Sequence, residues 1–577
     1  MNKKLLRSVR EYKKQSVLAP FFVILEVLME VLIPMEMAKI IDIGIAQGNL
    51  GYIVQRGIIL VIMAMLALFF GITAGNMAAI AGAGYAKNLR HDIFYRVQEF
   101  SFKNIDRFST SGLVTRMTTD ITNIQMAYMM SIRLLARAPI MIILSWVMTL
   151  MINKEIALIF LVVIPLLGGT LIFIAKKAHP HFIKVFDEYD VLNNSVQENV
   201  NASRVVKAFV REDYEIEKFH GISKFVYTLF TKAEKIVAWN SPVMQFTMYT
   251  VVIMLIAIGG RSIILGTMET GELTSIIVYA LQILMSLMMV TFVFVMIMIA
   301  EASTDRITEV LTEVPEMKDR ADAIKEVPNG EIIFDHVDFS YAGEGGNLSL
   351  KDVNLHIKSG QTIGIIGGTG SAKSTLVQLI PRLYDVTKGC VKVGGIDVRE
   401  YNLEVLRDQV SMVLQKNVLF SGSIYENIRW GDENATNEEV KRVCKLAQAD
   451  GFIKEFPLGY NTTIVQGGNN VSGGQKQRLC IARALLKKPK ILILDDSTSA
   501  VDTKTDALIR KAFREEIPNT TKIIIAQRVS SIEDADQIIV LDQGKIMGVG
   551  TSEELLQTNE IYREVYESQV KGGGDDE

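Results

Sequence analysis

The chain contains 577 residues, of which 61 are Lys or Arg and 64 are Asp or Glu, giving a formal net charge of −3 at pH 7. This length exceeds one ordinary domain, and the nearly neutral charge argues against a nucleic-acid partner. The cysteines lie far apart without metal-ligand spacing, which indicates reduced cytosolic thiols. They are Cys390, Cys444 and Cys480.

The N-terminus is basic and leads directly into a long apolar stretch. A cleavable signal peptide would carry a short apolar core and a small-residue cleavage site, and no such site is visible here. The sequence therefore predicts an amphipathic helix that lies on the cytosolic face of the membrane and continues into a retained span. The basic residues are Lys3, Lys4, Arg7, Arg10, Lys13 and Lys14.

Six stretches in the first half of the chain are long enough to cross a membrane as helices, which takes about 20 mainly apolar residues each. An even number of spans returns the chain to the side where it began. The Lys- and Arg-rich segments 85–116 and 176–235 lie on that side, which identifies it as the cytoplasm. We therefore expect a multi-pass protein of the cell (plasma) membrane whose N-terminus and C-terminal half are cytoplasmic. The stretches are residues 17–41, 57–82, 134–152, 156–175, 243–265 and 273–299.

The connections after the second and fourth spans are long and compatible with helix. Residues 83–133 and 176–242 lack long Gly/Pro clusters, so each could extend two spans far into the cytoplasm, at about 1.5 Å per residue. We expect the tips of these hairpins near Asn104–Ser111 and Arg204–Glu212, where short helices would reach a cytosolic domain.

Several ionisable residues lie within or beside the predicted spans. Glu26 and Glu30 are four residues apart on one helix face, and Arg133 and Arg137 share that spacing at the start of the third span. Such groups are costly at membrane depth and usually face a bundle interior or a wet cavity. One interpretation is that these charges pair with one another, or that Glu36 and Arg133 merely reach the interfaces. The other is that Glu26 and Glu30 line a cavity for cationic cargo.

The second half of the chain has the pattern of a soluble α/β domain. Residues 300–328 are compatible with a helix that continues from the sixth span, with Pro315 and Pro328 at the joint. Short apolar or alternating runs then predict strands. The predicted strands are Glu331–Tyr341, Leu350–Ile357, Gln361–Ile366 and Ile491–Asp495.

A glycine-rich loop between a predicted strand and a predicted helix matches the phosphate-binding pattern GxxxxGK[S/T] in its expected context. Its backbone N–H groups would surround a phosphate, Lys373 would supply a charge, and the Ser374 hydroxyl would reach Mg²⁺. Ala372 replaces the usual last glycine, and if this position needs a positive φ its methyl group costs about 1 kcal/mol. The candidate binding residues are Gly367, Gly368, Thr369, Gly370, Ser371, Ala372, Lys373, Ser374 and Thr375.

Three residues elsewhere in the chain extend this candidate site. Asp495 ends an apolar strand and can hold Mg²⁺ through its water shell. Gln415 is suited to sense a γ-phosphate and to share the metal site with Ser374 and Asp495. Tyr341 could stack on adenine, although a tyrosine at the end of a strand is usually only an edge residue.

The order of these elements carries a family resemblance. The second half resembles an ATP-binding cassette (ABC) domain, and the Val-Ser-Gly-Gly-Gln element is its most specific motif. With the six spans, nearly the whole chain resembles a half-size ABC exporter of the multidrug type: an all-α membrane domain followed by an α/β P-loop ATPase cassette domain. This resemblance implies ATP and Mg²⁺ as cofactors. The order is Tyr341, the phosphate loop, Gln415, Val471–Gln475, Ile491–Asp495, Ser499–Asp502 and Ala526–Arg528.

The resemblance also implies how two such chains work together. Two cassettes pair head to tail around two ATP molecules, and the hairpin tips resemble the coupling helices that transmit cassette closure to the spans. The signature residues of one chain contact the ATP held by its partner. In this chain they are Ser472, Gly473, Gly474 and Gln475.

Two residues depart from the family pattern at the hydrolysis positions. Asp496 stands where the family has a Glu that polarises the attacking water, and Gln527 where it has a His that contacts the γ-phosphate. Asp is shorter than Glu by roughly 1.5 Å, and a misplacement near 1 Å can cost about 100-fold in rate. Gln lacks the charge and shape of imidazole. We expect bound ATP to be long-lived here; the alternative is a slow but functional site in a homodimer.

The expected partner is a second, non-identical half-transporter with Glu and His at the matching positions. The pair would export amphipathic drugs or lipids, with hydrolysis mainly at the site that the partner completes. An ATP-gated channel and a dedicated lipid or peptide exporter remain alternatives. The expected domains are a transmembrane domain (residues 1–314), a linker (315–330), a cassette (331–568) and a disordered tail (569–577).

Overall fold

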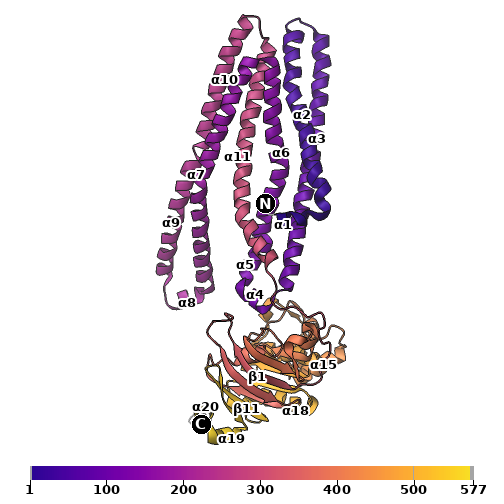
Figure 1. Ribbon diagram of the computed structural model, residues 1–577, viewed down its shortest axis with the longest axis vertical. Helices are drawn as coiled ribbons and strands as arrows, with labels where there is room; N and C mark the ends of the chain where they lie inside the picture. Colours follow the sequence, from indigo (N-terminus) through magenta and orange to yellow (C-terminus); the bar gives the residue numbers. More distant parts are fainter. Residues whose placement is uncertain (1–2, 498, 572–577) are drawn as a thin grey trace. The chain divides into compact units, whose positions relative to one another are not determined.

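The computed structural model describes residues 3–497 and 499–571, which fall into two compact units (Figure 1). The membrane unit comprises Met1–Glu99 and Phe108–Glu313, and the cassette unit comprises Phe100–Arg107 and Val314–Glu577. The short segment Phe100–Arg107 therefore belongs by its contacts to the cassette unit, although both of its chain neighbours belong to the membrane unit.

Six helical segments among the described residues are long and apolar enough to span a membrane, and each overlaps one predicted stretch, which confirms the predicted fold class. They are Arg7–Ile45, Leu50–Gln98, Thr110–Ile152, Lys154–Val185, Glu212–Ile264 and Thr270–Thr312. The helices of the membrane unit are α1 (Lys3–Leu6), η1 (Arg7–Tyr12), α2 (Lys13–Lys39), η2 (Ile40–Ile45), α3 (Leu50–Gln98), α5 (Thr110–Thr115), η3 (Arg116–Asp120), α6 (Ile121–Ile152), α7 (Lys154–Asn201), α8 (Ser203–Ala208), α9 (Glu212–Val237), α10 (Asn240–Ile264) and α11 (Thr270–Thr312).

The helices of the membrane unit pack in two sets that α11 connects, since it contacts α6 as well as α7 and α10. Helix α2 packs against α3 and α6, and α11 packs against α6, while α7 pairs with α9 and α10 (Figure 1). Val23, Val27 and Val31 recur at every fourth residue of α2, so they form one buried stripe, which meets Met141 of α6 and Tyr279 of α11.

Most of the ionisable residues singled out in the spans form ion pairs, within α2 or between helices. The Arg137 guanidinium on α6 bonds the carboxylates of Glu26 and Glu30 on α2, with closest N–O distances of 2.6 and 2.7 Å. Glu36 forms ion pairs with Lys39 and Arg56. The pairing interpretation is therefore correct for Glu26, Glu30 and Arg137.

Short helices lie at both hairpin tips, as expected. Helix α4 (Phe102–Arg107) follows α3, and α8 follows α7. The expected helix over residues 300–328 is wrong in its second part, because α11 ends at Thr312 and no regular helix follows before β1. Pro315 disfavours the helical conformation at Val314 just before it, which accounts for this end.

Two larger sheets form the cassette unit. A four-stranded antiparallel sheet has the order β2-β1-β4-β5, and a six-stranded sheet has the order β12-β11-β3-β10-β9-β6 with only β12 antiparallel. The strands are β1 (Ile332–Phe339), β2 (Leu350–Ile357), β3 (Thr362–Ile366), β4 (Lys388–Val393), β5 (Ile396–Asp397), β6 (Val410–Val413), β9 (Ile491–Asp495), β10 (Thr521–Ile525), β11 (Gln537–Asp542) and β12 (Lys545–Gly550), with a small pair β7 (Gly422–Ser423) and β8 (Thr463–Ile464).

Helices cover the six-stranded sheet and complete the buried core of the cassette unit. The apolar runs of β3, β9 and β10 place these parallel strands at its buried centre. The helices are α12 (Lys373–Gln378), α13 (Leu403–Gln409), α14 (Ile424–Arg429), α15 (Asn437–Leu446), α16 (Asp450–Glu455), α17 (Gly473–Leu486), α18 (Thr503–Glu516), α19 (Ser552–Thr558) and α20 (Glu560–Lys571). Helix α20 includes residues 569–571 of the expected tail, and residues 572–577 lie outside the described residues.

Candidate functional site

A cavity of about 790 Å³ lies where β3, β9 and β10 end. Ligands of open parallel sheets bind at this carboxyl edge, because the loops there diverge and leave a crevice. The cavity brings together most of the predicted site residues from five separate parts of the sequence. Those lining it are Tyr341, Gly367–Thr375, Gln415, Asp495, Asp496 and Gln527.

The loop after β3 wraps around the side chain of Lys373. The Lys373 Nζ donates to the carbonyl oxygens of Gly367 and Gly368, both at 2.8 Å, and lies 3.3 Å from the Ser371 Oγ. Gly367 admits no side chain, since a Cβ there would lie 2.0 Å from the Leu541 carbonyl oxygen. The loop therefore needs glycine at its start for close backbone packing.

Ala372 adopts the left-handed conformation, with φ 73° and ψ 26°. Only glycine enters this region without steric cost, because the Cβ of any other residue meets the backbone. The expectation that this position needs a positive φ is therefore correct, and the loop carries local strain of about 1 kcal/mol.

Burial shifts the pKa values of the ionisable side chains around this loop. It lowers the pKa of Lys373, an effect that the nearby carboxylates of Asp495 and Asp496 partly oppose. Burial also raises the pKa values of Asp495 and Asp496. Two buried carboxylates beside one ammonium give the site an excess of negative charge that a cation would relieve.

The residues predicted to hold the metal offer only oxygen ligands. The Ser374 hydroxyl donates to Asp495 Oδ1 at 2.9 Å, and Gln415 lines the same cavity. Hydroxyl, carboxylate and amide oxygens suit Mg²⁺, which usually keeps several waters and phosphate oxygens as well. The described part of the chain has no group of three or more His, Cys, Asp or Glu side chains placed to hold a metal ion. The donor set therefore fits a Mg²⁺ shared with a phosphate ligand.

Asp496 and Gln527, the two residues that depart from the family pattern, contact each other. The Gln527 Nε2 donates to Asp496 Oδ2 at 2.7 Å. The backbone of Asp496 is left-handed, with φ 49°, and its N–H donates to the Ile525 carbonyl oxygen at 3.1 Å. The turn after β9 thus fixes the Asp496 carboxylate beside the end of β10, with one oxygen bonded to an amide.

Tyr341 lies at the edge of the cavity, and the residue is 45% exposed. Its hydroxyl lies 3.0 Å from the Thr375 Oγ1, within hydrogen-bonding distance. The ring meets those of Phe339 and Tyr384 edge to face, with centroids 4.8 and 5.2 Å apart. These contacts fix the orientation of the Tyr341 ring, and its exposed surface is available to a planar ligand.

The signature residues do not line this cavity. Ser472 caps the N-terminus of α17 in a reciprocal capping box with Gln475. Gly474 packs tightly on the next loop, since a Cβ there would lie 2.7 Å from the Ala500 carbonyl oxygen. The cavity thus contains the predicted phosphate-loop, adenine and metal residues. The signature residues lie outside it, at the start of α17.

Sequence reasoning missed seven residues that line the cavity. Gln543 and Gly544 form the turn between β11 and β12, and a Cβ on Gly544 would lie 2.2 Å from the Ser349 carbonyl oxygen. A turn-forming Gln-Gly after a buried strand was the one available signal. Nothing in the local sequence points to the others. The missed residues are Leu348, Ser349, Ile366, Ile525, Gln543, Gly544 and Val565.

Comparisons with known proteins match both halves of the chain. The family model described as "ABC transporter transmembrane region" matches residues 16–287, and that described as "ABC transporter" matches residues 350–499. The chain is 36% identical to the ABC transporter ATP-binding protein YfiB of Bacillus subtilis, covering 98% of each protein. It is 34% identical to an ATP-dependent lipid A-core flippase of Desulfotalea psychrophila, covering 88% of this chain and 89% of that protein.

A solved structure has the same fold. The structure of a bacterial Atm1-family ABC exporter with ATP bound matches with a TM-score of 0.85 at 24% identity, covering 97% of this chain and 99% of that one. The likeness therefore extends over both units and is not confined to the cassette.

Proposed function

The chain belongs to the ABC transporter family as a half-size exporter, with six spans fused to one cassette, and from this premise we propose that it is the poorly hydrolysing subunit of a heterodimer. In this proposal the chain binds ATP at the cavity described above and exports amphipathic drugs or lipids together with its partner. The Asp496–Gln527 hydrogen bond is the observation that carries the proposal.

The binding part of the proposal rests on the loop and its surroundings. The backbone N–H groups of Gly368–Lys373 and the Lys373 ammonium would hold the phosphates, with Tyr341 against the base. Ser374, Gln415 and Asp495 would hold Mg²⁺. When bound, this ion would neutralise phosphate charge. Lys373 now donates to loop carbonyl oxygens at 2.8 Å, and it would exchange these partners for phosphate oxygens.

The weak hydrolysis rests on the geometry of Asp496. A general base must offer a free carboxylate oxygen within hydrogen-bonding reach of the attacking water. Here Oδ2 already accepts a bond from the Gln527 amide at 2.7 Å, and the side chain is one methylene shorter than Glu. The Gln527 Nε2 can donate but cannot accept, so this bond cannot relay a proton. One oxygen of the carboxylate is therefore occupied, and the group is withdrawn by one methylene.

The signature element supports a role at a second site. Ser472 and Gly473 begin a 14-residue helix, α17, whose N-terminal dipole and free N–H groups favour a phosphate. These residues do not line the chain's own cavity. In the proposed heterodimer they face the ATP held by the partner, whose Glu and His would carry out most of the hydrolysis.

The exposed tip at α8 supports assembly with a second chain. Val205, Phe209 and Val210 around this short helix are 56%, 74% and 81% exposed. Val210 also adopts a positive φ of 50°, which is costly for a β-branched residue. Exposed apolar side chains beside a strained turn are more favourable in contact with another protein than in contact with water. A partner's cassette would cover them.

ATPase measurements on purified full-length chain test the assignment. The wild-type chain alone should hydrolyse ATP slowly, and the double variant Asp496→Glu/Gln527→His should be faster by about tenfold to 100-fold. Because the two residues touch, the single variants should not add up to the double one. The variant Lys373→Ala measures contaminating activity. Wild-type turnover equal to that of the double variant would contradict the proposal.

Cargo is tested separately from hydrolysis. In vesicles that contain the heterodimer, ATP should drive a fluorescent lipid or a cationic amphipath against its gradient, in line with the lipid transport for which the flippase relative is named. Removing Mg²⁺ with a chelator should stop this movement. ATP-dependent single-channel currents without accumulation of the cargo would contradict export and support the ATP-gated channel instead.

A further inference from the structure

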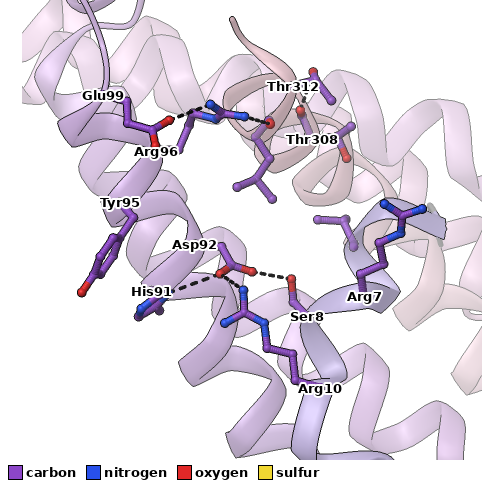
Figure 2. Close-up of a pocket in the computed structure, with 12 residues that line it drawn as sticks. Arg7, Ser8, Arg10, His91, Asp92, Tyr95, Arg96, Glu99, Thr308 and Thr312 are labelled. Carbon is purple, nitrogen blue, oxygen red and sulfur yellow. Dashed lines mark hydrogen bonds and ion pairs between the residues drawn. The ribbon is translucent and has the colours of Figure 1, made fainter. Parts of the chain in front are cut away.

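Side-chain hydrogen bonds hold the described chain in place near both of its ends. In the membrane unit, the Ser8 hydroxyl and the Arg10 guanidinium donate to Asp92 of α3, at 2.7 and 2.6 Å (Figure 2). In the cassette unit, Gln569 near the end of helix α20 donates to the backbone of Gln527. The first contact joins two parts of the membrane unit, whereas the second reaches a residue of the candidate nucleotide site.

The side chain of Gln569 spans two backbone groups. Its Nε2 donates to the Gln527 carbonyl oxygen, and its Oε1 accepts from the Val529 N–H, both at 2.8 Å. A carboxamide carries a donor and an acceptor side by side, so it can bond two backbone groups at once. The stretch Ala526–Val529, which we call the switch segment, follows β10 and carries Gln527. Gln569 therefore holds the switch segment at two points.

The Val529 N–H depends on this partner. Val529 is 2% exposed, so water has little access to its backbone. Within residues 3–497 and 499–571, this N–H forms no hydrogen bond other than that to Gln569. A buried N–H without a partner is costly, because it loses its bonds to water and gains none. Although Gln569 is exposed, the group that it satisfies is buried, so water does not simply replace it.

Helix α20 is anchored in the cassette unit and can act as a support. Tyr562 is fully buried, and its hydroxyl lies 2.8 Å from the Ser552 Oγ of α19. Val565 packs against the hydrophobic core of the unit and also lines the nucleotide cavity. Gln569 follows Val565 by four residues, so the two lie on the same face of the helix. One face of α20 thus contacts both the cavity and the switch segment.

We propose, building on the proposed function, that Gln569 is a positioning residue for ATP hydrolysis, which keeps the side chain of residue 527 directed at that of residue 496. Gln569 bonds the backbone of Gln527, and the Gln527 side-chain amide donates to Asp496 Oδ2 at 2.7 Å. In this chain the contact preserves the unproductive Asp496–Gln527 bond. With Glu and His at the two positions, the same contact would preserve a productive arrangement.

Steady-state ATPase measurements on the purified full-length chain test this role in two backgrounds. In Asp496→Glu/Gln527→His, adding Gln569→Met should lower kcat by about tenfold, because a positioning contact is lost. KM for ATP should stay within about twofold, since the phosphate loop is untouched. In the wild-type background Gln569→Met should not lower kcat, because it removes a restraint on a base that is already occupied. Methionine is unbranched like glutamine but cannot bond both backbone groups.

The matched control is Gln557→Met. Gln557 is exposed on α19, and its side chain forms no hydrogen bond among the described residues. It should change kcat by less than about twofold in either background. An equal fractional loss of kcat from Gln569→Met in both backgrounds would show a merely structural role and overturn the positioning role. Wild-type turnover equal to that of Asp496→Glu/Gln527→His would instead contradict the proposed function, and the comparison with Gln557→Met within each background would still measure the effect of Gln569.

Hydrogen exchange at the Val529 amide gives a readout that does not depend on turnover. In Gln569→Met this amide should exchange about tenfold faster than in the wild-type chain, because its acceptor is gone. In Gln557→Met it should exchange at the wild-type rate. Unchanged exchange in Gln569→Met would show that Gln569 does not hold the switch segment and would overturn the proposal. Thermal unfolding of each variant confirms that it is folded.

Discussion

At the scale of single residues, the nucleotide loop carries a cost that its sequence pattern only suggested. Ala372 occupies a left-handed position, immediately before the lysine that organises the loop. Its methyl group meets the backbone there and stores about 1 kcal/mol of strain. Asp496 occupies a second left-handed position, after β9, in the same cavity. The site that we propose to hold ATP is thus locally strained at two points.

Ala372→Gly should relieve the first strain. We expect the free energy of unfolding of the cassette to rise by up to about 1 kcal/mol, with ATP bound at least as tightly as before. The matched control is Ala507→Gly, at an exposed position inside helix α18, which should lower stability by a similar amount. Chemical denaturation and ATP titration measure both effects. A loss of stability in Ala372→Gly would show that the positive φ is not a source of strain.

At the scale of elements, Tyr384 connects helix α4 to the edge of the nucleotide cavity. The Tyr384 hydroxyl donates to Asp106 Oδ2 of α4 at 2.7 Å, and its ring meets Phe102 of the same helix. On its other side Tyr384 contacts Tyr341 at the cavity edge. Burial and the Asp106 carboxylate raise the pKa of Tyr384, so it stays a hydrogen-bond donor. Tyr384 thus contacts both α4 and the proposed adenine site.

Tyr384→Phe should uncouple these elements while leaving ATP binding intact. The ring contacts remain and only the bond to Asp106 is lost, at a cost of about 1 kcal/mol. We expect ATP affinity within about twofold of wild type but a clear loss of substrate-stimulated ATPase in the assembled transporter. Tyr401→Phe is the control, because it loses a hydroxyl bond to the Val393 carbonyl oxygen at 2.8 Å, away from α4. Equal stimulation in both variants would remove α4 from the coupling path.

At the scale of the whole molecule, one guanidinium links two spans by its charge. Arg137 on α6 joins Glu26 and Glu30 on α2, and the three side chains are 20%, 10% and 29% exposed. The carboxylates of Glu26 and Glu30 are both paired with Arg137, so they offer little attraction to a cationic cargo. Removing one partner of such a group is costly, since it leaves a buried charge uncompensated.

Arg137→Gln should therefore destabilise the membrane unit by about 3–5 kcal/mol. The triple variant Glu26→Gln/Glu30→Gln/Arg137→Gln should recover most of this loss, because no net charge remains. Arg133→Gln is the matched control: among the described residues Arg133 has no ion pair, and we expect a change below about 0.5 kcal/mol. Thermal unfolding in detergent measures all three. A triple variant no more stable than Arg137→Gln would refute the charge argument.

The sequence alone determined the six spans, the α/β cassette and the loop around Lys373, because each depends on local patterns. A span needs only a sufficient apolar run, and a phosphate loop needs strand, glycines and helix in order. The end of α11 at Thr312 was not predicted, since residues 313–328 are compatible with helix by composition and only Pro315 marks the change.

Only the tertiary structure decided which distant residues meet. It brought Gln527 onto Asp496, Arg137 between Glu26 and Glu30, and Gly544 against Ser349. It also placed the side chain of Gln569 against the backbone of Gln527 and Val529. Side chains of this kind carry no local periodicity. Their contacts follow from strand order and helix packing. These pairs therefore form only when the whole chain has folded.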